Sequence, residues 1–407
     1  MSKTIITDVR PWGGEPADVI VTDGLIAAIV PPGTGPADGH PVIDGDGRLL
    51  VPGFSDVHVH LDSTRLGLPF RPQTGERGRW GRIMNDREHW RAAEEPVAER
   101  ATHTLGVMIA HGATRVRSHA QVDADSGLEK LQGVLAARET HRDRASVEVV
   151  AFPQVGIHLE KGVVELLDEA LRMGADVVGG IDPCEIDRDP VRHVDTVFDL
   201  ATRHGKPIDI HLHEAGTRGL FSLSLITDRV RALGMQGQAT ISHAFCLVDD
   251  VTPGLGREVA TAIDTLAELD VAVTTIAPGS RVDLPVRRLV DAGVRLGLGM
   301  DGQRDYWSPY GDGDMLARTY QLAFTQDFDY AEELELAMAL GTWGGASVID
   351  ASIPRVAVGA APGLAVGDPA DFVLLPGESV ASAVVDRSQD KVVVHAGEVV
   401  ARQGRLL

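Results

Sequence analysis

Short apolar runs alternate with segments of helical spacing through the middle of the chain. Residues 163–171 and 285–292 show the clearest amphipathic pattern, with apolar positions three and four residues apart. The apolar runs are Leu49–Phe54, Thr114–Ser118, Val147–Phe152, Asp176–Ile181, Pro207–His211, Ala239–His243, Val271–Ile276 and Val294–Met300. Eight repeats of strand and helix predict an α/β protein with a parallel (β/α)8 barrel of the TIM type. A doubly wound open sheet is the alternative.

Both ends of the chain carry strand-like runs that are separated by glycine and proline. The runs are 18–22, 25–30 and 40–44 near the N-terminus, and 370–376, 391–395 and 397–401 near the C-terminus. Two β-rich ends around a different middle predict a small β-sandwich domain formed from both termini. We expect this domain to comprise residues 1–52 and 362–407, and the barrel to comprise 53–361. Two unrelated terminal arms are the alternative.

The charge and cysteine content limit the possible partners and compartment. The 407 residues include 38 Lys and Arg against 59 Asp and Glu, which gives a net charge of −21. This charge repels phosphate backbones and anionic membranes, so we expect no nucleic-acid or membrane partner. Cys184 and Cys246 are too few for a disulfide framework and suit a reducing cytoplasm. The chain shows neither a signal-peptide run nor an apolar stretch long enough to span a bilayer.

Several predicted barrel strands end in residues that bind metal ions. Active-site groups of such barrels lie at the C-terminal ends of the strands. The first strand leads to His58 and His60, which are two residues apart and therefore point to one side of an extended chain. The fifth strand repeats this pattern with His211 and His213, and His243 follows the sixth.

Asp301 follows the eighth strand and adds a carboxylate to these imidazoles. A single histidine at a strand end is usually a packed or hydrogen-bonded residue. Histidine or aspartate at four strand ends indicates a common centre instead. Three imidazoles and one carboxylate suit Zn²⁺ or Fe²⁺ and leave a coordination position for water.

The order of these residues resembles the amidohydrolase superfamily. Residues 51–62, with the sequence VPGFSDVHVHLD, look like its opening motif, and 367–375 resemble its return to a small β domain. Residues 151–156, 174–180, 211–214 and 305–311 are similar to the cytosine deaminase branch. Residues 179–183, 216–219, 242–246 and 304–315 are similar to the N-isopropylammelide amidohydrolases, which remove an alkylamine from a triazine ring.

The chain departs from both patterns at single positions. Cytosine deaminases carry a second, substrate-contacting Asp directly after the metal-binding Asp, where this chain has Gly302. They also carry Asp where this chain has His213. The triazine enzymes have Asp at the position of Glu214. The site therefore combines the two patterns.

The resemblance implies a role for each candidate residue. The implied metal ligands are His58, His60, His211 and Asp301. Asp301 would also accept a proton from the attacking water, and His243 would hydrogen-bond that water and the oxygen that forms. Glu214 would protonate a ring nitrogen and the leaving amine. Gln154 would bind the ring edge and Trp307 would stack on the ring. His213 would orient Glu214, contact the substrate or act as an acid itself.

The resemblance also bears on the number of metal ions. Two-metal relatives use a carboxylated lysine at the end of the fourth strand, but Lys161 and Lys206 lie elsewhere in the sequence. We therefore expect one divalent ion. His119, at the end of the second strand, either supports the metal ligands or only lines the barrel. The Arg- and Gly-rich residues 65–79 form either a lid over the pocket or an exposed loop.

Together these observations predict a metal-dependent hydrolytic deaminase. It would release ammonia or an amine from a small amino-substituted N-heterocycle, a cytosine-like pyrimidine or an aminotriazine. The alternatives are a cyclic amide or amidine hydrolase of the same superfamily and a non-enzymatic descendant on this fold. The resemblance also implies a homo-oligomer.

Overall fold

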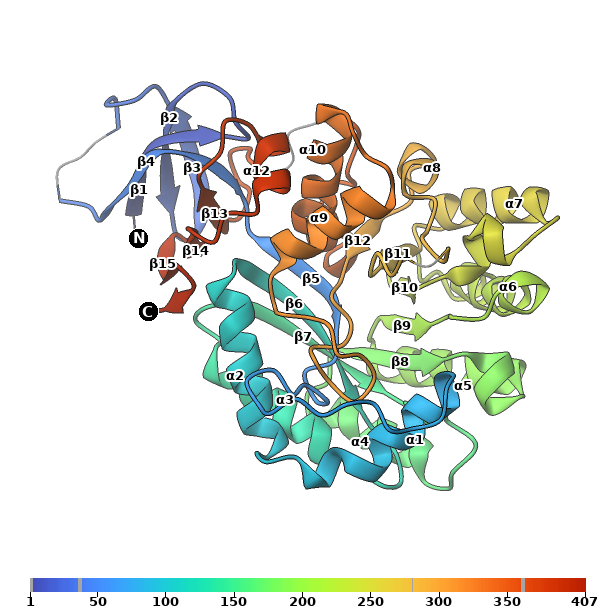
Figure 1. The fold of residues 1–407 in the computed structure, drawn as a ribbon. Coiled ribbons are helices and arrows are strands. Elements are labelled where there is room, and N and C mark those ends of the chain that lie inside the picture. The colour runs from blue at the N-terminus through green and yellow to red at the C-terminus, as the bar shows by residue number, and fades with distance from the viewer. Residues whose placement is uncertain (1–2, 36–38, 280, 360–362) are drawn as a thin grey trace.

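Eight parallel strands form a nearly closed barrel in the computed structural model, which describes residues 3–35, 39–279, 281–359 and 363–407 (Figure 1). The strands are β5 (Phe54–Val59), β6 (Ala113–Gln121), β7 (Ser146–Phe152), β8 (Val177–Ile181), β9 (Ile208–His211), β10 (Ala239–Ser242), β11 (Ala272–Thr275) and β12 (Leu296–Leu298). They neighbour one another in chain order. A parallel bridge between Val59 and Asp301 brings the last strand back to the first. The predicted barrel is confirmed, and the doubly wound open sheet is wrong.

Helices follow the strands and surround the barrel (Figure 1). They are α1 (Arg79–His89), α2 (Val97–Ala110), α3 (Glu129–Thr140), α4 (Val163–Arg172), α5 (Pro190–His204), α6 (Gly216–Leu233), α7 (Gly256–Glu268), α8 (Val286–Asp291), α9 (Met315–Thr325), α10 (Ala331–Ala339) and α11 (Gly345–Ile349). One further helix, α12 (Val380–Asp386), lies between strands of the terminal sheet in the chain and packs against α9 and α10. Helix α5 shows why such segments begin and end where they do. The Asp189 side chain caps its first turn, Pro190 is its first residue, and Gly205 ends it at φ 62°. Among the described residues, no helix is long and apolar enough to cross a membrane.

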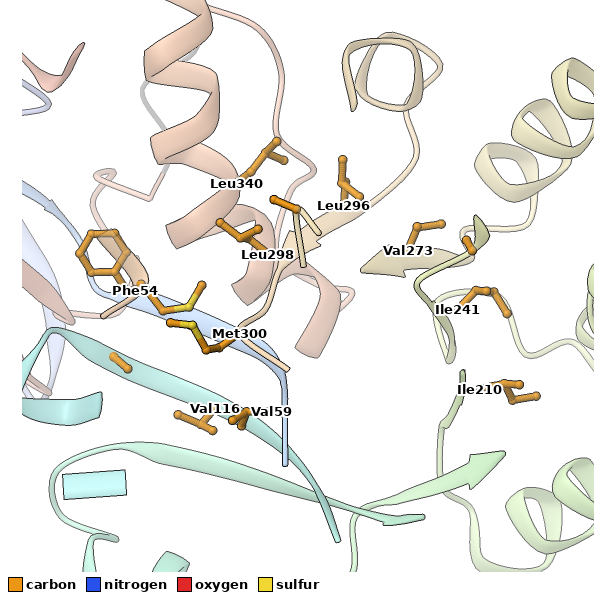
Figure 2. Close-up of a cluster of buried hydrophobic side chains, with 14 of the residues drawn as sticks. Phe54, Val59, Val116, Ile210, Ile241, Val273, Leu296, Leu298, Met300 and Leu340 are labelled. Carbon is orange, nitrogen blue, oxygen red and sulfur yellow. The ribbon is translucent and has the colours of Figure 1, made fainter. Parts of the chain in front are cut away.

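The barrel strands pack a common apolar core. Figure 2 shows a cluster of buried side chains, of which the labelled ones are at most 3 % exposed. They include Phe54, Val59, Val116, Ile210, Ile241, Val273, Leu296, Leu298, Met300 and Leu340. Burial of each such side chain contributes about 1.5–3 kcal/mol to the stability of the fold. The core therefore holds the strand ends in place.

The two chain ends form a separate sheet, whose blue and red strands lie side by side in Figure 1. The strands are β1 (Lys3–Pro11), β2 (Ala17–Thr22), β3 (Leu25–Val30), β4 (Val42–Pro52), β13 (Phe372–Leu375), β14 (Val392–His395), β15 (Glu398–Arg402) and β16 (Arg405–Leu406). Pairing of Val51 with Val373 joins the two ends. Their side chains share an apolar core that includes Ile6, Leu50 and Phe372. The separate β unit is confirmed, and the two unrelated arms are wrong. Its eight strands make one continuous sheet.

The exact extent of the two domains stays a proposal. We propose that the β domain comprises 1–52 and 362–407 and the barrel 53–361. The second boundary falls at residues 360–362, outside the described residues.

The apolar run Leu49–Phe54 was predicted as one barrel strand, and this prediction is wrong. Strand β4 ends at Pro52 and pairs within the terminal sheet, whereas the barrel begins with Phe54 in β5. Gly53 separates them, and a Cβ at this position would lie 2.2 Å from the Thr114 hydroxyl oxygen. The chain therefore passes from sheet to barrel at a residue that has no room for a side chain. Strands β1 and β16 were not predicted, because polar residues interrupt their apolar pattern.

A buried ion pair links the barrel to the terminal sheet. Lys391 Nζ donates to Asp314 Oδ1 at 2.6 Å, and the side chains are 0 % and 3 % exposed. Lys391→Met would leave the Asp314 carboxylate buried without its cation, so we expect the free energy of unfolding to fall by about 3–5 kcal/mol. Urea unfolding followed by circular dichroism measures the change. The double variant Lys391→Met/Asp314→Asn should recover part of the loss. A single variant as stable as the wild type would contradict this expectation.

Candidate active site

Imidazole rings from separate barrel strands meet at the C-terminal end of the barrel. His58 lies on β5, His119 on β6 and His211 at the end of β9, and His60 follows β5 directly. One nitrogen of each ring lies within 4.8 Å of the others. The sequence predicted that these strand ends converge, and the structure brings the side chains together.

A second group shares His58 and adds His243 and Asp301, again with ligand atoms within 4.8 Å of one another. Asp301 Oδ1 lies 3.4 Å from His60 Nε2 and 3.7 Å from His58 Nε2. His211 Nε2 lies 3.4 Å from His60 Nε2. Two atoms that each bind one Zn²⁺ at about 2.1 Å in a tetrahedral arrangement are about 3.4 Å apart. The spacing of these groups therefore fits a shared divalent ion.

The backbone holds two of these residues in an unusual conformation. His243 and Asp301 have φ values of 71° and 64°, in the left-handed region that residues other than glycine rarely adopt. Asp301 is fixed there by backbone hydrogen bonds, since its N–H donates to the carbonyl of His58 at 2.7 Å. Such strain is commonly found at functional sites, and here it turns both side chains toward the cluster.

The imidazole nitrogens have the chemistry of metal ligands. His58 Nε2, His211 Nδ1 and both ring nitrogens of His243 are buried without a hydrogen-bond partner among the described residues. Burial lowers the pKa of His60 to about 4 and the pKa values of His211 and His243 well below the usual value. The rings are therefore neutral at physiological pH, which is the form that binds a metal. The donor set fits a divalent ion.

A hydrogen-bond chain orients the central ligand. His58 Nδ1 lies 2.9 Å from Ser242 Oγ, and Ser242 Oγ donates to Asp209 Oδ1 at 2.7 Å. With Nδ1 engaged in this way, Nε2 is left for the ion, as is usual for metal-binding histidines. His119 lies on the same side, with its Nε2 3.6 Å from Asp209 Oδ1. The structure thus places His119 inside the imidazole cluster rather than in the barrel wall away from it.

The cluster opens into a cavity of about 410 Å³, a size suited to a small heterocycle. Seven of the residues predicted to act at the site line this cavity: His60, Gln154, His211, His213, His243, Asp301 and Trp307. Gln154 is 4 % exposed, and its side-chain amide has no hydrogen bond within the described part of the chain. Trp307 packs against Ile83, Phe152 and neighbouring apolar residues and forms part of the wall.

His213 lies in the cavity wall and belongs to a second polar group. Its Nδ1 lies 2.8 Å from Asp182 Oδ2, and its backbone N–H donates to Asp182 Oδ1 at 2.7 Å. Its ring stacks on His243, with centroids 4.1 Å apart. Burial alone would raise the pKa of Asp182, but His213 and Arg79 hold it below its usual value. An ionised carboxylate therefore backs the His213 ring.

Glu214 lies behind the cavity wall rather than in it. Its Oε1 accepts the backbone N–H of Glu185 at 2.7 Å, and its Oε2 accepts the Ser222 hydroxyl at 2.5 Å. Burial raises the pKa of this carboxyl. In an extended segment His211 and His213 point to one side and Glu214 to the other. Glu214, like His58, is not among the residues that line the cavity, and its role as an acid on the substrate stays a prediction.

Sequence reasoning missed several polar residues of the site, among them Asp182, Arg79 and Asp305. Asp182 follows β8 directly, and its place at a strand end was the available signal. Arg79 begins α1 and reaches Asp182 Oδ2 at 3.1 Å and Glu185 Oε1 at 2.9 Å, so part of the Arg-rich loop does belong to the site. Asp305 lines the cavity, and no sequence signal separated it from the other loop residues.

Comparison with known proteins agrees with this geometry. The sequence profile of the Amidohydrolase family matches residues 41–401. The chain belongs to the amidohydrolase family. It is 29 % identical over 368 residues to the N-isopropylammelide isopropyl amidohydrolase of Pseudomonas sp. (strain ADP), with 88 % of each chain covered.

Two solved structures resemble this amidohydrolase along nearly its whole length. N-isopropylammelide isopropylaminohydrolase from Burkholderia multivorans ATCC 17616 is 38 % identical, with a TM-score of 0.91 and 100 % of both chains covered. The 5-methylcytosine deaminase from Klebsiella pneumoniae, liganded with phosphonocytosine, is 26 % identical, with a TM-score of 0.81 and 98 % of both chains covered. Both branches suspected from the sequence are therefore represented among its relatives.

The end of β8 bears on the number of ions that this amidohydrolase holds. Asp182 stands there, not a lysine. Lys130 is buried, but its Nζ is held by Asp86 at 2.6 Å and by Gln121 at 2.5 Å. Its ammonium is therefore already engaged, and the described residues offer no lysine that could bridge two ions at β8.

Proposed function

We propose that this amidohydrolase is a metal-dependent deaminase that releases ammonia or an alkylamine from an amino-substituted N-heterocycle. One observation carries the proposal. The cavity of heterocycle size brings the His–Asp metal group together with a carboxylate-backed histidine, His213, and an unpartnered amide, Gln154. The groups that would bind the metal, deliver a proton and recognise the ring thus face the same cavity.

Aminotriazines are the substrate class that we place first. His213 and Gly302 are the two departures from the cytosine deaminase pattern, and His213 lines the cavity. The similarity to the Burkholderia multivorans isopropylaminohydrolase, at 38 % identity, supports the same choice. Cytosine-like pyrimidines are the second class. We further propose a cytoplasmic enzyme that assembles as a homo-oligomer.

Four residues would hold one divalent ion, Zn²⁺ or Fe²⁺: His58, His60, His211 and Asp301. When bound, such an ion lowers the pKa of water toward 7 and polarises the bond under attack. The Asp301 carboxylate would accept a proton from the attacking water. His243, whose ring nitrogens have no partner among the described residues, would hydrogen-bond the oxygen that forms.

The heterocycle would be held by Gln154 and by the face of Trp307. A carboxamide offers two donors and one acceptor, which complements the alternating C=O and N–H edge of an oxotriazine or pyrimidinone. Water adds to the ring carbon that carries the amino group, and the C–N bond then breaks. The departing nitrogen needs a proton, and His213 is the cavity group that we assign to deliver it. The ionised Asp182 stabilises the protonated ring.

Glu214→Gln tests whether Glu214 or His213 supplies that proton. Glutamine keeps an oxygen acceptor for the Glu185 N–H, and its NH₂ can donate to the Ser222 hydroxyl, which then accepts instead of donating, so both local contacts survive. If His213 is the donor, we expect kcat to fall by less than about tenfold, whereas loss of a general acid costs about 10²–10⁴-fold. Steady-state amine release measures this. A loss above a hundredfold with normal metal content would return the acid role to Glu214.

A substrate panel tests the function itself. The purified metal-loaded enzyme is incubated with aminotriazines, alkylaminotriazines, cytosine, 5-methylcytosine and cyclic amides. Released ammonia or alkylamine is quantified, and ring opening is followed by loss of ring absorbance. Amine release from one class supports the proposal and names the substrate. Ring opening without amine release would point to a cyclic amide hydrolase instead.

A further inference from the structure

A buried carboxylate that no predicted role uses lines the same cavity. Asp305 is 6 % exposed and lies in the loop after β12. Its Oδ1 accepts the backbone N–H groups of Trp307 at 2.7 Å and Ser308 at 2.9 Å. Its Oδ2 receives only a long hydrogen bond, from the Ser63 hydroxyl at 3.3 Å. One oxygen thus supports the loop, and the other has spare acceptor capacity.

Asp305 occupies the space that a side chain at position 302 would fill. A Cβ built on Gly302 would lie 2.6 Å from Asp305 Oδ2 and 3.0 Å from its Cγ. Gly302 directly follows the predicted metal ligand Asp301. In the cytosine deaminase pattern, this position carries an Asp that contacts the substrate. Here Gly302 has no side chain, and the carboxylate of Asp305 fills the space instead.

The surroundings of Asp305 do not neutralise its charge. No Lys or Arg of the described residues forms an ion pair with it, and the nearby carboxylates Asp301 and Asp86 oppose its ionisation. Burial is the main cause that raises its pKa, to about 7. A loop-capping role alone needs only the oxygen that accepts the two N–H groups, which an asparagine would supply equally. The second oxygen has only the long hydrogen bond from Ser63 to offset the cost of its burial.

We propose that Asp305 is a specificity residue whose Oδ2 accepts an N–H of the bound heterocycle beside the carbon under attack. This inference rests on the proposed function. The N–H would belong to the departing amino group. A monoalkylamino group keeps one N–H, whereas a dialkylamino group has none. The enzyme should therefore prefer primary and monoalkylated amino groups to dialkylated ones.

The test compares wild type, Asp305→Asn, Asp305→Ala and the double variant Gly302→Asp/Asp305→Ala. Each is assayed for kcat and KM with a monoalkylamino and a dialkylamino triazine that differ only in that N–H. Metal content and thermal midpoint are measured alongside. Asparagine keeps the loop-capping acceptor but presents an NH₂ donor in place of Oδ2, so it separates recognition from loop structure.

Above pH 7, where the Asp305 carboxyl is ionised, we expect wild type to favour the monoalkylamino substrate by about 10- to 100-fold in kcat/KM. This is the range for a hydrogen bond to a charged group. Asp305→Asn should lose this preference, mainly through a higher KM, with unchanged metal content and thermal midpoint. The double variant should regain part of it, because position 302 then has room for its own carboxylate.

Two results would overturn parts of the account in different ways. If wild type releases amine but Asp305→Asn stays within threefold of it on both substrates, the inference about Asp305 is wrong while the proposed function stands. The same holds if Asp305→Ala only lowers the thermal midpoint without changing the preference. If metal-loaded wild type releases no amine from any heterocycle, the proposed function itself fails.

Discussion

Replacement of His211 by alanine is expected to remove both the bound metal and the activity. The His211 ring is buried at the end of β9, its Nδ1 has no partner among the described residues, and its Nε2 lies 3.4 Å from His60 Nε2. Loss of this donor leaves the site one ligand short. Because a bound ion contributes several kcal/mol to the stabilisation of the transition state, amine release should fall by at least about a thousandfold.

Metal analysis of the dialysed variant, together with amine release, measures this effect. His40→Ala serves as the control, since His40 is an exposed histidine near the terminal sheet and far from the cluster in the chain. The control should keep its metal and full activity. A His211→Ala protein that retains stoichiometric metal and activity would show that the remaining His and Asp residues of the cluster suffice without His211. The assigned ligand set would then be wrong.

The second large effect is expected from His213→Asn. Asparagine is close in size to the proximal part of the imidazole and keeps a polar group near Asp182, but it cannot deliver a proton. Amine release should fall by about 10²–10⁴-fold, the usual contribution of a general acid. Metal content should stay at the wild-type level, because His213 is not among the grouped ligand atoms.

Asp182→Asn provides the matched comparison for this prediction. It removes the charge behind the ring while the ring remains, so kcat should fall by about 10- to 100-fold, less than for His213→Asn. Steady-state kinetics with the best substrate of the panel measures both. If His213→Asn changes KM alone and leaves kcat intact, His213 binds substrate and does not transfer a proton.

Much of the fold was predictable because the spacing of apolar residues differs clearly between the strand and helix segments of this sequence. The run Val147–Phe152 and the amphipathic segment 163–171 became β7 and α4 with only small shifts at their ends. The boundary at Gly53 was not predictable in the same way. Leu49 and Phe54 belong to one apolar run, but they pair with different sheets, and the close approach of Gly53 to Thr114 at the boundary is a tertiary contact.

The metal group was predictable for a related reason. Parallel strands of a barrel end at the same face, so His58, His211 and Asp301 had to lie near one another once their strands were placed. Glu214 was harder, because a shift of one residue along an extended segment reverses the direction of a side chain. Asp305 could not be found from sequence, since its position depends on how a loop folds back over Gly302.

Metal reconstitution tests the central claim most directly. The enzyme is stripped with a chelator, then titrated with Zn²⁺ or with Fe²⁺ under anaerobic conditions, while bound metal and released amine are followed together. The account predicts no amine release from the stripped protein, and a rise that saturates at one ion per chain. Full amine release without metal, or saturation only at two ions per chain, would contradict it.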